Sequence, residues 1–284
     1  MQPITFAVAG DLHVGSVSEP VQTLIRIVNE RRPDFLLFLG DLTHTASESE
    51  LADFVQQVRR VTVPVYLTIG NHDTARLPEG FDIEQRLGRM FPGPWGTSFT
   101  YAFEVAGWQF IVLVAHSGRV DQIGYQVHNI KGFISEGGGI IRVPEDHMRR
   151  LEGLLEAAGD RPTCLVSHVP LVHMPDRIYR RGCFDQVRYI EELHLLSLLD
   201  HHPNVRLALA GHQHFNQAEV RNHALHCVTQ GVCGYPPYKD GNALRWVELS
   251  DAGVRSYLVW DGLDEEPPAD IGTLDGDRSF RWDF

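Results

Sequence analysis

The feature that most constrains the fold is a set of short apolar runs, each followed at once by glycine or by a polar residue. Ile4–Ala9, Phe35–Leu39 and Val65–Ile69 are runs of this kind, and Pro20–Arg31 and Ser47–Arg59 between them carry apolar residues at helical spacing. Apolar runs this short are typical of strands buried on both faces. Strands that alternate with helices predict parallel pairing in an α/β fold.

The rest of the chain predicts more strands, a hairpin and further helices. Ala106-Gly107 separates two apolar segments and is a two-residue turn signal. Thr163–Ser167 and Val205–Ala210 are further apolar runs, and residues 217–260 have the pattern of an antiparallel meander. The remaining expectations are helices at Pro144–Ala158 and Val187–Leu199, and mostly loop over Leu77–Thr100.

Two segments lack a steady period and extend beyond this pattern. Residues 117–143 include three consecutive glycines and are expected to form a lid excursion. Residues 261–284 are acidic and end in Phe280, Trp282 and Phe284, so we expect a tail that docks on its own domain or on a second subunit. The predicted organisation is a catalytic domain over residues 1–260 and a C-terminal tail over 261–284.

Side chains that can bind metals follow five of the expected strands. They are, in chain order, Gly10-Asp11-Leu12-His13, Gly40-Asp41, Gly70-Asn71-His72-Asp73, His168 and Gly211-His212-Gln213-His214. Ligands of open α/β sheets bind outside the carboxyl ends of the strands, and glycine lets the backbone turn sharply there. Imidazole and carboxylate suit transition metals, and a metal pair suits phosphoryl chemistry. Each motif alone is weak, but the five in this order predict a metal site.

Charge and cysteine content limit the partners. Lys and Arg total 25 against 37 Asp and Glu, a net charge of −12, which argues against binding duplex nucleic acid. None of the four cysteines has Cys-x-x-Cys spacing, and neither a signal peptide nor a membrane-spanning apolar run is apparent. We expect a cytoplasmic protein without a membrane partner that takes a small phosphoester substrate; a homodimer is left open.

Taken together, the five motifs resemble the signature of the calcineurin-like metallophosphoesterase family, from about residue 4 to about residue 260. The resemblance implies a four-layer α-β-β-α sandwich, in which two mixed β-sheets are flanked by helices. It also implies two transition metal ions, Fe, Mn or Zn, where the strands end. The ligands that it implies are Asp11, His13 and His214 for the first metal, Asn71, His168 and His212 for the second, and Asp41 for both.

The resemblance further implies a mechanism. A hydroxide between the metals would attack phosphorus in line with the leaving oxygen. His72 holds the position that the family uses close to the leaving group, where it would stabilise the transition state and donate a proton.

Details of the motifs narrow the family resemblance. The Gly40-Asp41 motif lacks the Asp-Arg-Gly continuation of Ser/Thr protein phosphatases, and Asp73 stands where those enzymes have Glu. The pattern is more similar to class III cyclic nucleotide phosphodiesterases and bacterial glycerophosphodiesterases, which implies a small phosphodiester substrate. A phosphomonoesterase is the alternative. A nuclease is disfavoured by the acidic charge, and a catalytically silent scaffold is disfavoured because every implied ligand is present.

Other residues carry weaker signals. His44 stands where purple acid phosphatases have a metal-binding Tyr, and either faces the site or lies on the surface. His116 follows an expected strand and is a candidate to contact a metal ligand without binding the metal itself. The three arginines that follow His168 either clamp a phosphate or lie in a solvated loop; they are Arg177, Arg180 and Arg181.

Overall fold

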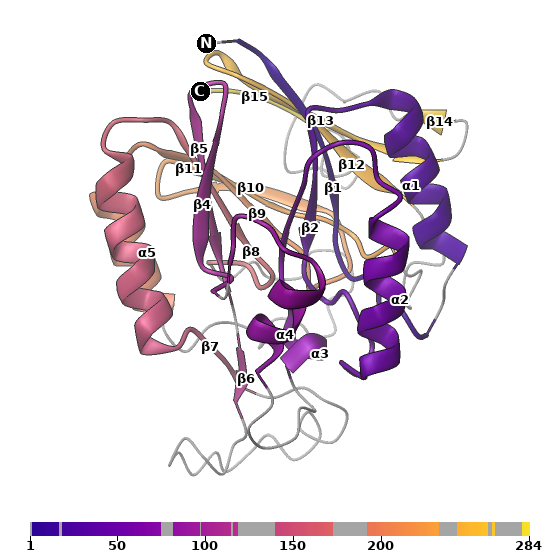
Figure 1. The fold of residues 1–284 in the computed structure, drawn as a ribbon. Coiled ribbons are helices and arrows are strands. Elements are labelled where there is room, and N and C mark those ends of the chain that lie inside the picture. The colour runs from indigo at the N-terminus through magenta and orange to yellow at the C-terminus, as the bar shows by residue number, and fades with distance from the viewer. Residues whose placement is uncertain are drawn as a thin grey trace.

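Two mixed sheets lie face to face between helices in a computed structural model of the chain (Figure 1). This arrangement confirms the predicted α-β-β-α sandwich. The structure describes residues 2–16, 19–74, 82–96, 98–114, 116–118, 140–172, 192–232, 243–260, 263–264 and 280–284.

The first sheet has seven strands in the order β14-β13-β12-β1-β2-β3, with β15 also paired to β13. Their bounds are β1 (Ile4–Ala9), β2 (Phe35–Leu39), β3 (Val65–Thr68), β12 (Leu244–Ser250), β13 (Gly253–Trp260), β14 (Leu263–Asp264) and β15 (Phe280–Asp283). The first three strands are parallel, as predicted, because α1 (Glu19–Arg31) and α2 (Glu48–Val58) make the crossovers between them. Their carboxyl ends therefore lie at one edge of the sandwich.

The second sheet has six strands in the order β10-β11-β9-β8-β5-β4. Their bounds are β4 (Tyr101–Val105), β5 (Trp108–Leu113), β8 (Thr163–Ser167), β9 (Val205–Ala210), β10 (Gln217–Arg221) and β11 (Ala224–Val228). The expected hairpin joins β4 to β5, and its turn residues Ala106 and Gly107 have φ of +48° and +88°. Two left-handed residues in succession match the right-handed twist of the strands they connect.

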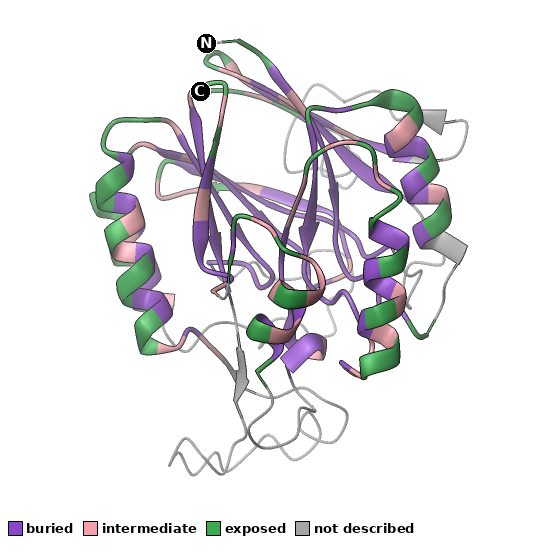
Figure 2. Cartoon of the chain, viewed as in Figure 1, coloured by how far each residue is buried: buried purple, intermediate pink, exposed green. Residues whose placement is uncertain are grey.

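Helices cover the outer face of each sheet. α1 and α2 lie against the first sheet, and α5 (Glu145–Ala158) and α6 (Glu192–His201) pack with the second. Strand β5 shows how the layers share side chains: Phe110 and Val112 enter the core between the sheets, whereas Ile111 and Leu113 pack with α5 and α6. Figure 2 shows the result, with strands buried along their length and helices buried on one stripe.

Two sequence expectations are wrong in detail. The predicted meander is divided between the sheets, because β11 pairs in parallel with β9 while β12 pairs antiparallel with β1. Turn signals specify local pairing but not the sheet that a hairpin joins. The segment expected as loop contains α4 (Ile83–Met90), which the Asp82 side chain caps by accepting a hydrogen bond from the Gln85 N–H at 2.9 Å.

Parts of the expected lid, the start of the expected helix Val187–Leu199 and most of the tail lie outside the described residues. The two ends of the expected lid segment pair as β6 (His116–Gly118) and β7 (Ile140–Arg142), and α6 is described from Glu192. The end of the tail pairs with its own domain, since β15 joins β13 and Phe280 is buried. No helix in these described ranges is long and apolar enough to span a membrane.

Candidate metal centre

The candidate ligands from five strand ends meet at one edge of the sandwich. Asp11 and His13 follow β1, Asp41 follows β2, Asn71 opens the single-turn helix α3 (Asn71–Thr74), His168 follows β8, and His212 and His214 follow β9. In two groups that share Asp41, all ligand atoms lie within 4.8 Å of one another. The groups are Asp11, His13, Asp41 and His214, and Asp41, His168 and His212.

Asp41 joins the two groups through its two carboxylate oxygens. Oδ2 lies 3.6 Å from His13 Nε2, and Oδ1 lies 3.3 Å from His168 Nε2. The carboxylate is buried, and Oδ1 also accepts the His72 backbone N–H at 2.8 Å. Burial raises the pKa of Asp41, but His168 and neighbouring histidines hold it well below its usual value. A buried carboxylate with one oxygen toward each group is suited to bridge two cations.

Asp11 organises the first group. Its Oδ1 lies 3.1 Å from His214 Nε2, and its two oxygens accept the His212 backbone N–H at 3.1 and 3.0 Å. Burial raises the pKa of this carboxyl, but the attraction of His214 outweighs burial and the pKa is lowered overall. Asp11 is therefore ionised at neutral pH and holds both histidines of the Gly-His-x-His loop.

In the second group, nitrogen and oxygen atoms of His168, Asn71 and His212 face one another. The His168 Nδ1–H donates to the Leu39 carbonyl at 2.7 Å, which leaves Nε2 facing Asn71 Oδ1 at 2.9 Å and His212 Nδ1 at 3.2 Å. Burial disfavours a charge on His168, but Asp41 and Asp11 raise its pKa to about 9, so positive charge is favoured at this position. His212 Nε2 is also buried with no hydrogen-bond partner among the described residues. This donor set fits a transition metal ion.

Backbone strain is concentrated in the same residues. Left-handed φ values are rare outside glycine and cost about 1–3 kcal/mol each. Five candidate ligands adopt them: Asp11 (+53°), His13 (+46°), Asp41 (+48°), His212 (+66°) and His214 (+56°). Strain of this kind gathers at binding and catalytic sites, so the backbone points to the same centre as the side chains.

Glycine is required where the strand ends approach most closely. Gly40 has φ of +90°, which a residue with a side chain rarely adopts. A Cβ at Gly70 would overlap the Asp41 carboxylate and its backbone nitrogen, and would lie 2.8 Å from His168 Nε2. The two glycines thus allow the first sheet to bring Asp41 beside His168 of the second.

Asp73 has a positioning role that the sequence did not reveal. Its buried carboxylate accepts the N–H groups of Gly70, Leu42 and Thr43 at 2.9, 3.1 and 2.9 Å, and the Thr43 hydroxyl at 2.7 Å. Burial, with the nearby Asp41 charge, nevertheless raises its pKa to about 6. The carboxylate connects the loop that carries Asp41 to the loop that carries Asn71 and His72.

A second support lies behind the Gly-His-x-His loop. Asn216 Oδ1 accepts from the guanidinium of Arg245 at 2.6 Å and from the Gln230 N–H at 3.1 Å. All three residues are buried, and Arg245 also donates to Ser256 at 3.0 Å. This network holds the chain at Asn216, two residues beyond His214. No motif in the neighbouring sequence predicted it.

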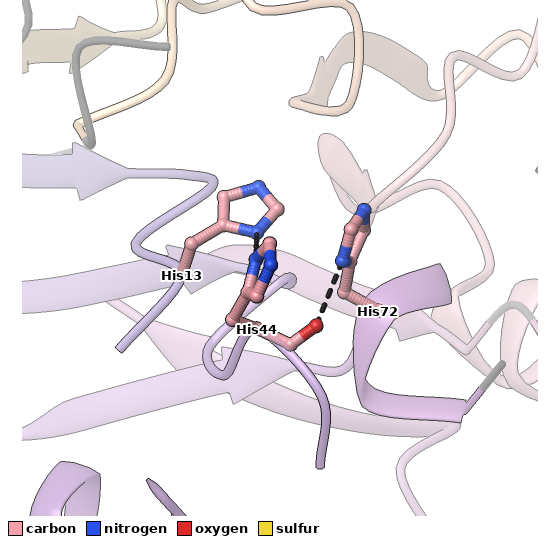
Figure 3. Close-up of side chains that lie close together, drawn as sticks. All are labelled: His13, His44 and His72. Carbon is pink, nitrogen blue, oxygen red and sulfur yellow. Dashed lines mark hydrogen bonds between the residues drawn. The ribbon is translucent and has the colours of Figure 1, made fainter. Parts of the chain in front are cut away.

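His44 faces the site, which decides the question that the sequence left open. His13, His44 and His72 gather with ligand nitrogens within 4.8 Å of one another (Figure 3). His72 is half-buried and its Nδ1–H donates to the His44 carbonyl at 2.9 Å. The side chain of His116 and the residues Arg177, Arg180 and Arg181 lie outside what the structure describes.

Comparison with known proteins decides the family. Residues 4–216 match the calcineurin-like phosphoesterases. The chain belongs to the calcineurin-like phosphoesterase family. Membership makes it a phosphoesterase, and the donor set described above agrees with the divalent metals that the family uses.

Among relatives of this calcineurin-like phosphoesterase, a 3′,5′-cyclic-nucleotide phosphodiesterase of Nostoc sp. is 22% identical over 243 residues, 81% of this chain and 79% of that protein. A "probable cyclic nucleotide phosphodiesterase" of Colwellia psychrerythraea is 33% identical over 89 residues, 27% of this chain and 34% of that protein. The crystal structure of a dimetal phosphatase from Danio rerio superposes with a TM-score of 0.69 at 17% identity, covering 93% of this chain and 98% of that one. That likeness shows the shared fold.

Proposed function

We propose that this chain is a dinuclear metal-dependent phosphodiesterase that hydrolyses small phosphodiesters of the cyclic nucleotide or glycerophosphodiester type. The observation that carries the proposal is the position of Asp41, whose two oxygens lie 3.6 and 3.3 Å from histidines of two different ligand groups. The first metal would be held by Asp11, His13, Asp41 and His214, and the second by Asp41, Asn71, His168 and His212. We further propose that the enzyme is cytoplasmic.

The bound metal pair would supply an activated water and neutralise charge on the phosphoryl oxygens. The chain's own residues orient that chemistry. Asp11 and Asp73 fix the loops, and His72 is the candidate proton donor to the leaving oxygen. His72 lies next to the ligand Asn71 but outside both ligand groups, with its ring 4.5 Å from that of His13. General acid catalysis from such a position contributes about 10²–10⁴-fold.

Two observations support a diester rather than a monoester. The relatives from Nostoc and Colwellia are both named for cyclic nucleotide phosphodiesterase activity. The chain carries a net charge of −12, and a diester brings one negative charge to it whereas a monoester brings nearly two. The long-range repulsion between the acidic protein and its substrate is therefore weaker for a diester.

The test compares a diester and a monoester that share a nitrophenolate leaving group, together with two natural classes of diester. The full chain is reconstituted with Mn, Zn, Fe or Co and assayed with bis(4-nitrophenyl) phosphate, 4-nitrophenyl phosphate, cyclic nucleotides and glycerophosphodiesters. We expect higher kcat/KM for the diesters. A tenfold preference for the monoester, about 1.4 kcal/mol in transition-state binding, would support a phosphomonoesterase instead. Metal binding without turnover of any substrate would indicate a scaffold.

A further inference from the structure

We propose that His44 is a positioning residue that connects the first metal site to the proton donor. Its ring Nδ1 lies within hydrogen-bond distance of His13 Nδ1, and its backbone carbonyl orients the His72 ring by accepting a hydrogen bond from it. The proposal rests on the function proposed above, because it assumes that His13 is a metal ligand.

The first contact concerns His13. Its Nε2 faces the Asp41 carboxylate at 3.6 Å, and its Nδ1 lies 3.5 Å from His44 Nδ1. A histidine that binds a metal through one ring nitrogen nearly always has the other bound by a neighbouring group, which fixes the ring and its tautomer. Here that neighbour is an imidazole. When the His13 Nδ1–H donates, His44 Nδ1 is the acceptor, so His44 is neutral and carries its proton on Nε2.

The second contact concerns His72. The His44 carbonyl oxygen lies 2.9 Å from His72 Nδ1, and a carbonyl can only accept a hydrogen bond (Figure 3). His72 therefore carries a proton on Nδ1, and Nε2 is the nitrogen left to face the reacting group, where it donates a proton only when the ring is protonated on both nitrogens. The rings of His44 and His72 also stack, with centroids 5.4 Å apart and an interplanar angle of 28°. The backbone carbonyl and the ring of His44 therefore both orient the imidazole of His72.

The loop that carries His44 is held on both sides. The His44 N–H donates to the Val14 carbonyl at 3.1 Å, beside a parallel bridge between Val14 and Thr43. On the other side the Thr45 N–H and hydroxyl donate to Glu50 of α2 at 2.7 and 2.9 Å. Because His44 sits between these anchors, a change in its side chain is expected to remove the ring contact to His13, while the loop keeps its place and the carbonyl contact to His72 is retained.

The first experiment measures metal affinity. His44→Gln keeps an acceptor for His13, whereas His44→Phe keeps a ring without nitrogen. His194→Phe is the control, since His194 is about half exposed on α6 and pairs with Glu152. Each full-length protein is loaded with excess zinc and dialysed against graded chelator, and bound zinc is measured by mass spectrometry. We expect His44→Phe to lose one of its two ions at about 10–100-fold lower chelator activity. His44→Gln should retain both ions as the control does.

Two outcomes of this titration would overturn the proposal. One is a His44→Phe titration that matches wild type. The other is a third zinc ion in wild type that His44→Phe removes, which would make the three histidines a metal site of their own. If wild type binds no metal at all, the proposed function fails, and the next measurement still tests His44.

The second experiment reads the tautomers directly. Long-range proton–nitrogen NMR of the full chain, recorded with and without zinc, distinguishes Nδ1–H from Nε2–H imidazoles. We expect Nδ1–H for His72 and Nε2–H for His44 in wild type, and a mixture of tautomers for His13 freed from zinc in His44→Phe. An Nε2–H tautomer of His72 in wild type would contradict the proposed contact.

Discussion

His168 follows β8 of the second sheet and Leu39 ends β2 of the first, and the Nδ1–H of His168 donates to the Leu39 carbonyl oxygen at 2.7 Å. The hydrogen bond links the two sheets at the end of β2, directly before Gly40 and Asp41. It also fixes the tautomer in which His168 offers its Nε2 lone pair to the second ligand group. Fold and site are therefore joined through one imidazole, and substitutions around it test the two proposed metal positions one at a time.

Asp41→Ala should lose both ions, because each ligand group loses a carboxylate oxygen. His168→Ala should lose mainly the ion of the second group and retain the first. Metal content after dialysis, measured by mass spectrometry, is expected to be close to zero for the first variant and close to one for the second. Equal metal content in the two variants would contradict a bridging role for Asp41.

His72→Ala should retain its metals and lose turnover. If His72 donates the proton, we expect kcat to fall by about 10²–10⁴-fold with an alkoxide leaving group. The fall should be much smaller with nitrophenolate, which leaves without a proton. Steady-state kinetics on a matched pair of diesters make the comparison, and an equal loss for both would indicate charge stabilisation in place of proton donation.

Gly70→Ala should disturb the centre, because the new Cβ would overlap the Asp41 carboxylate. We expect a loss of about 1–3 kcal/mol in the free energy of unfolding, together with weaker metal binding. Gly153→Ala is the matched control, since Gly153 is exposed in α5 with open space around its Cβ position. That variant should be more stable by up to about 1 kcal/mol, and urea unfolding checks both values. A wild-type metal affinity in Gly70→Ala would show that the strand ends are less constrained than described.

His226 should make stability fall in mild acid. It is buried in β11, and burial lowers its pKa to about 4 from the ordinary value of 6.5. Between these two pH values the unfolded chain binds a proton that the folded chain does not. The free energy of unfolding therefore keeps this contribution above pH 6.5 and loses about 2 kcal/mol of it between pH 7 and pH 5.

Replacing His226 isolates its contribution from that of the metal centre. Urea unfolding of His226→Leu should show a weaker pH dependence than wild type by about that amount. His223→Gln, at an exposed position of the same hairpin, should follow wild type. Parallel curves for wild type and His226→Leu would assign the acid sensitivity to other groups.

The sequence predicted the strands and helices whose pattern lies in neighbouring residues of the chain. The strands β1, β2, β8 and β9 coincide with apolar runs because each is buried on both faces. Helix α4 was missed because it is only eight residues long and lies between Pro- and Gly-rich flanks. Ile83, Leu87 and Met90 have helical spacing and Asp82 precedes them, but two turns are too short to outweigh the flanks, and an aspartate before a turn is common.

Long-range relations could not be predicted from pattern alone. No periodicity tells that β12 lies beside β1, or that the Arg245 guanidinium reaches Asn216 across 29 positions of the chain. The same limit applies to His44. Its place after Gly40-Asp41 was visible in the sequence, but the direction of its ring depends on anchors at Val14 and Glu50, which come from two other parts of the chain.

The pairing of β15 with β13 leaves both ends of the described chain at one side of the molecule. Pro3 and Arg281 line the same surface groove, and Figure 1 shows the N and C labels together, with β1 running away from them. The candidate ligands Asp11 and His13 follow the far end of β1. Six residues of extended strand separate that end from the centre by roughly 20 Å. An affinity tag, a fusion partner or a surface linker attached at either end would therefore leave the substrate's approach open, which suits the enzyme to immobilisation.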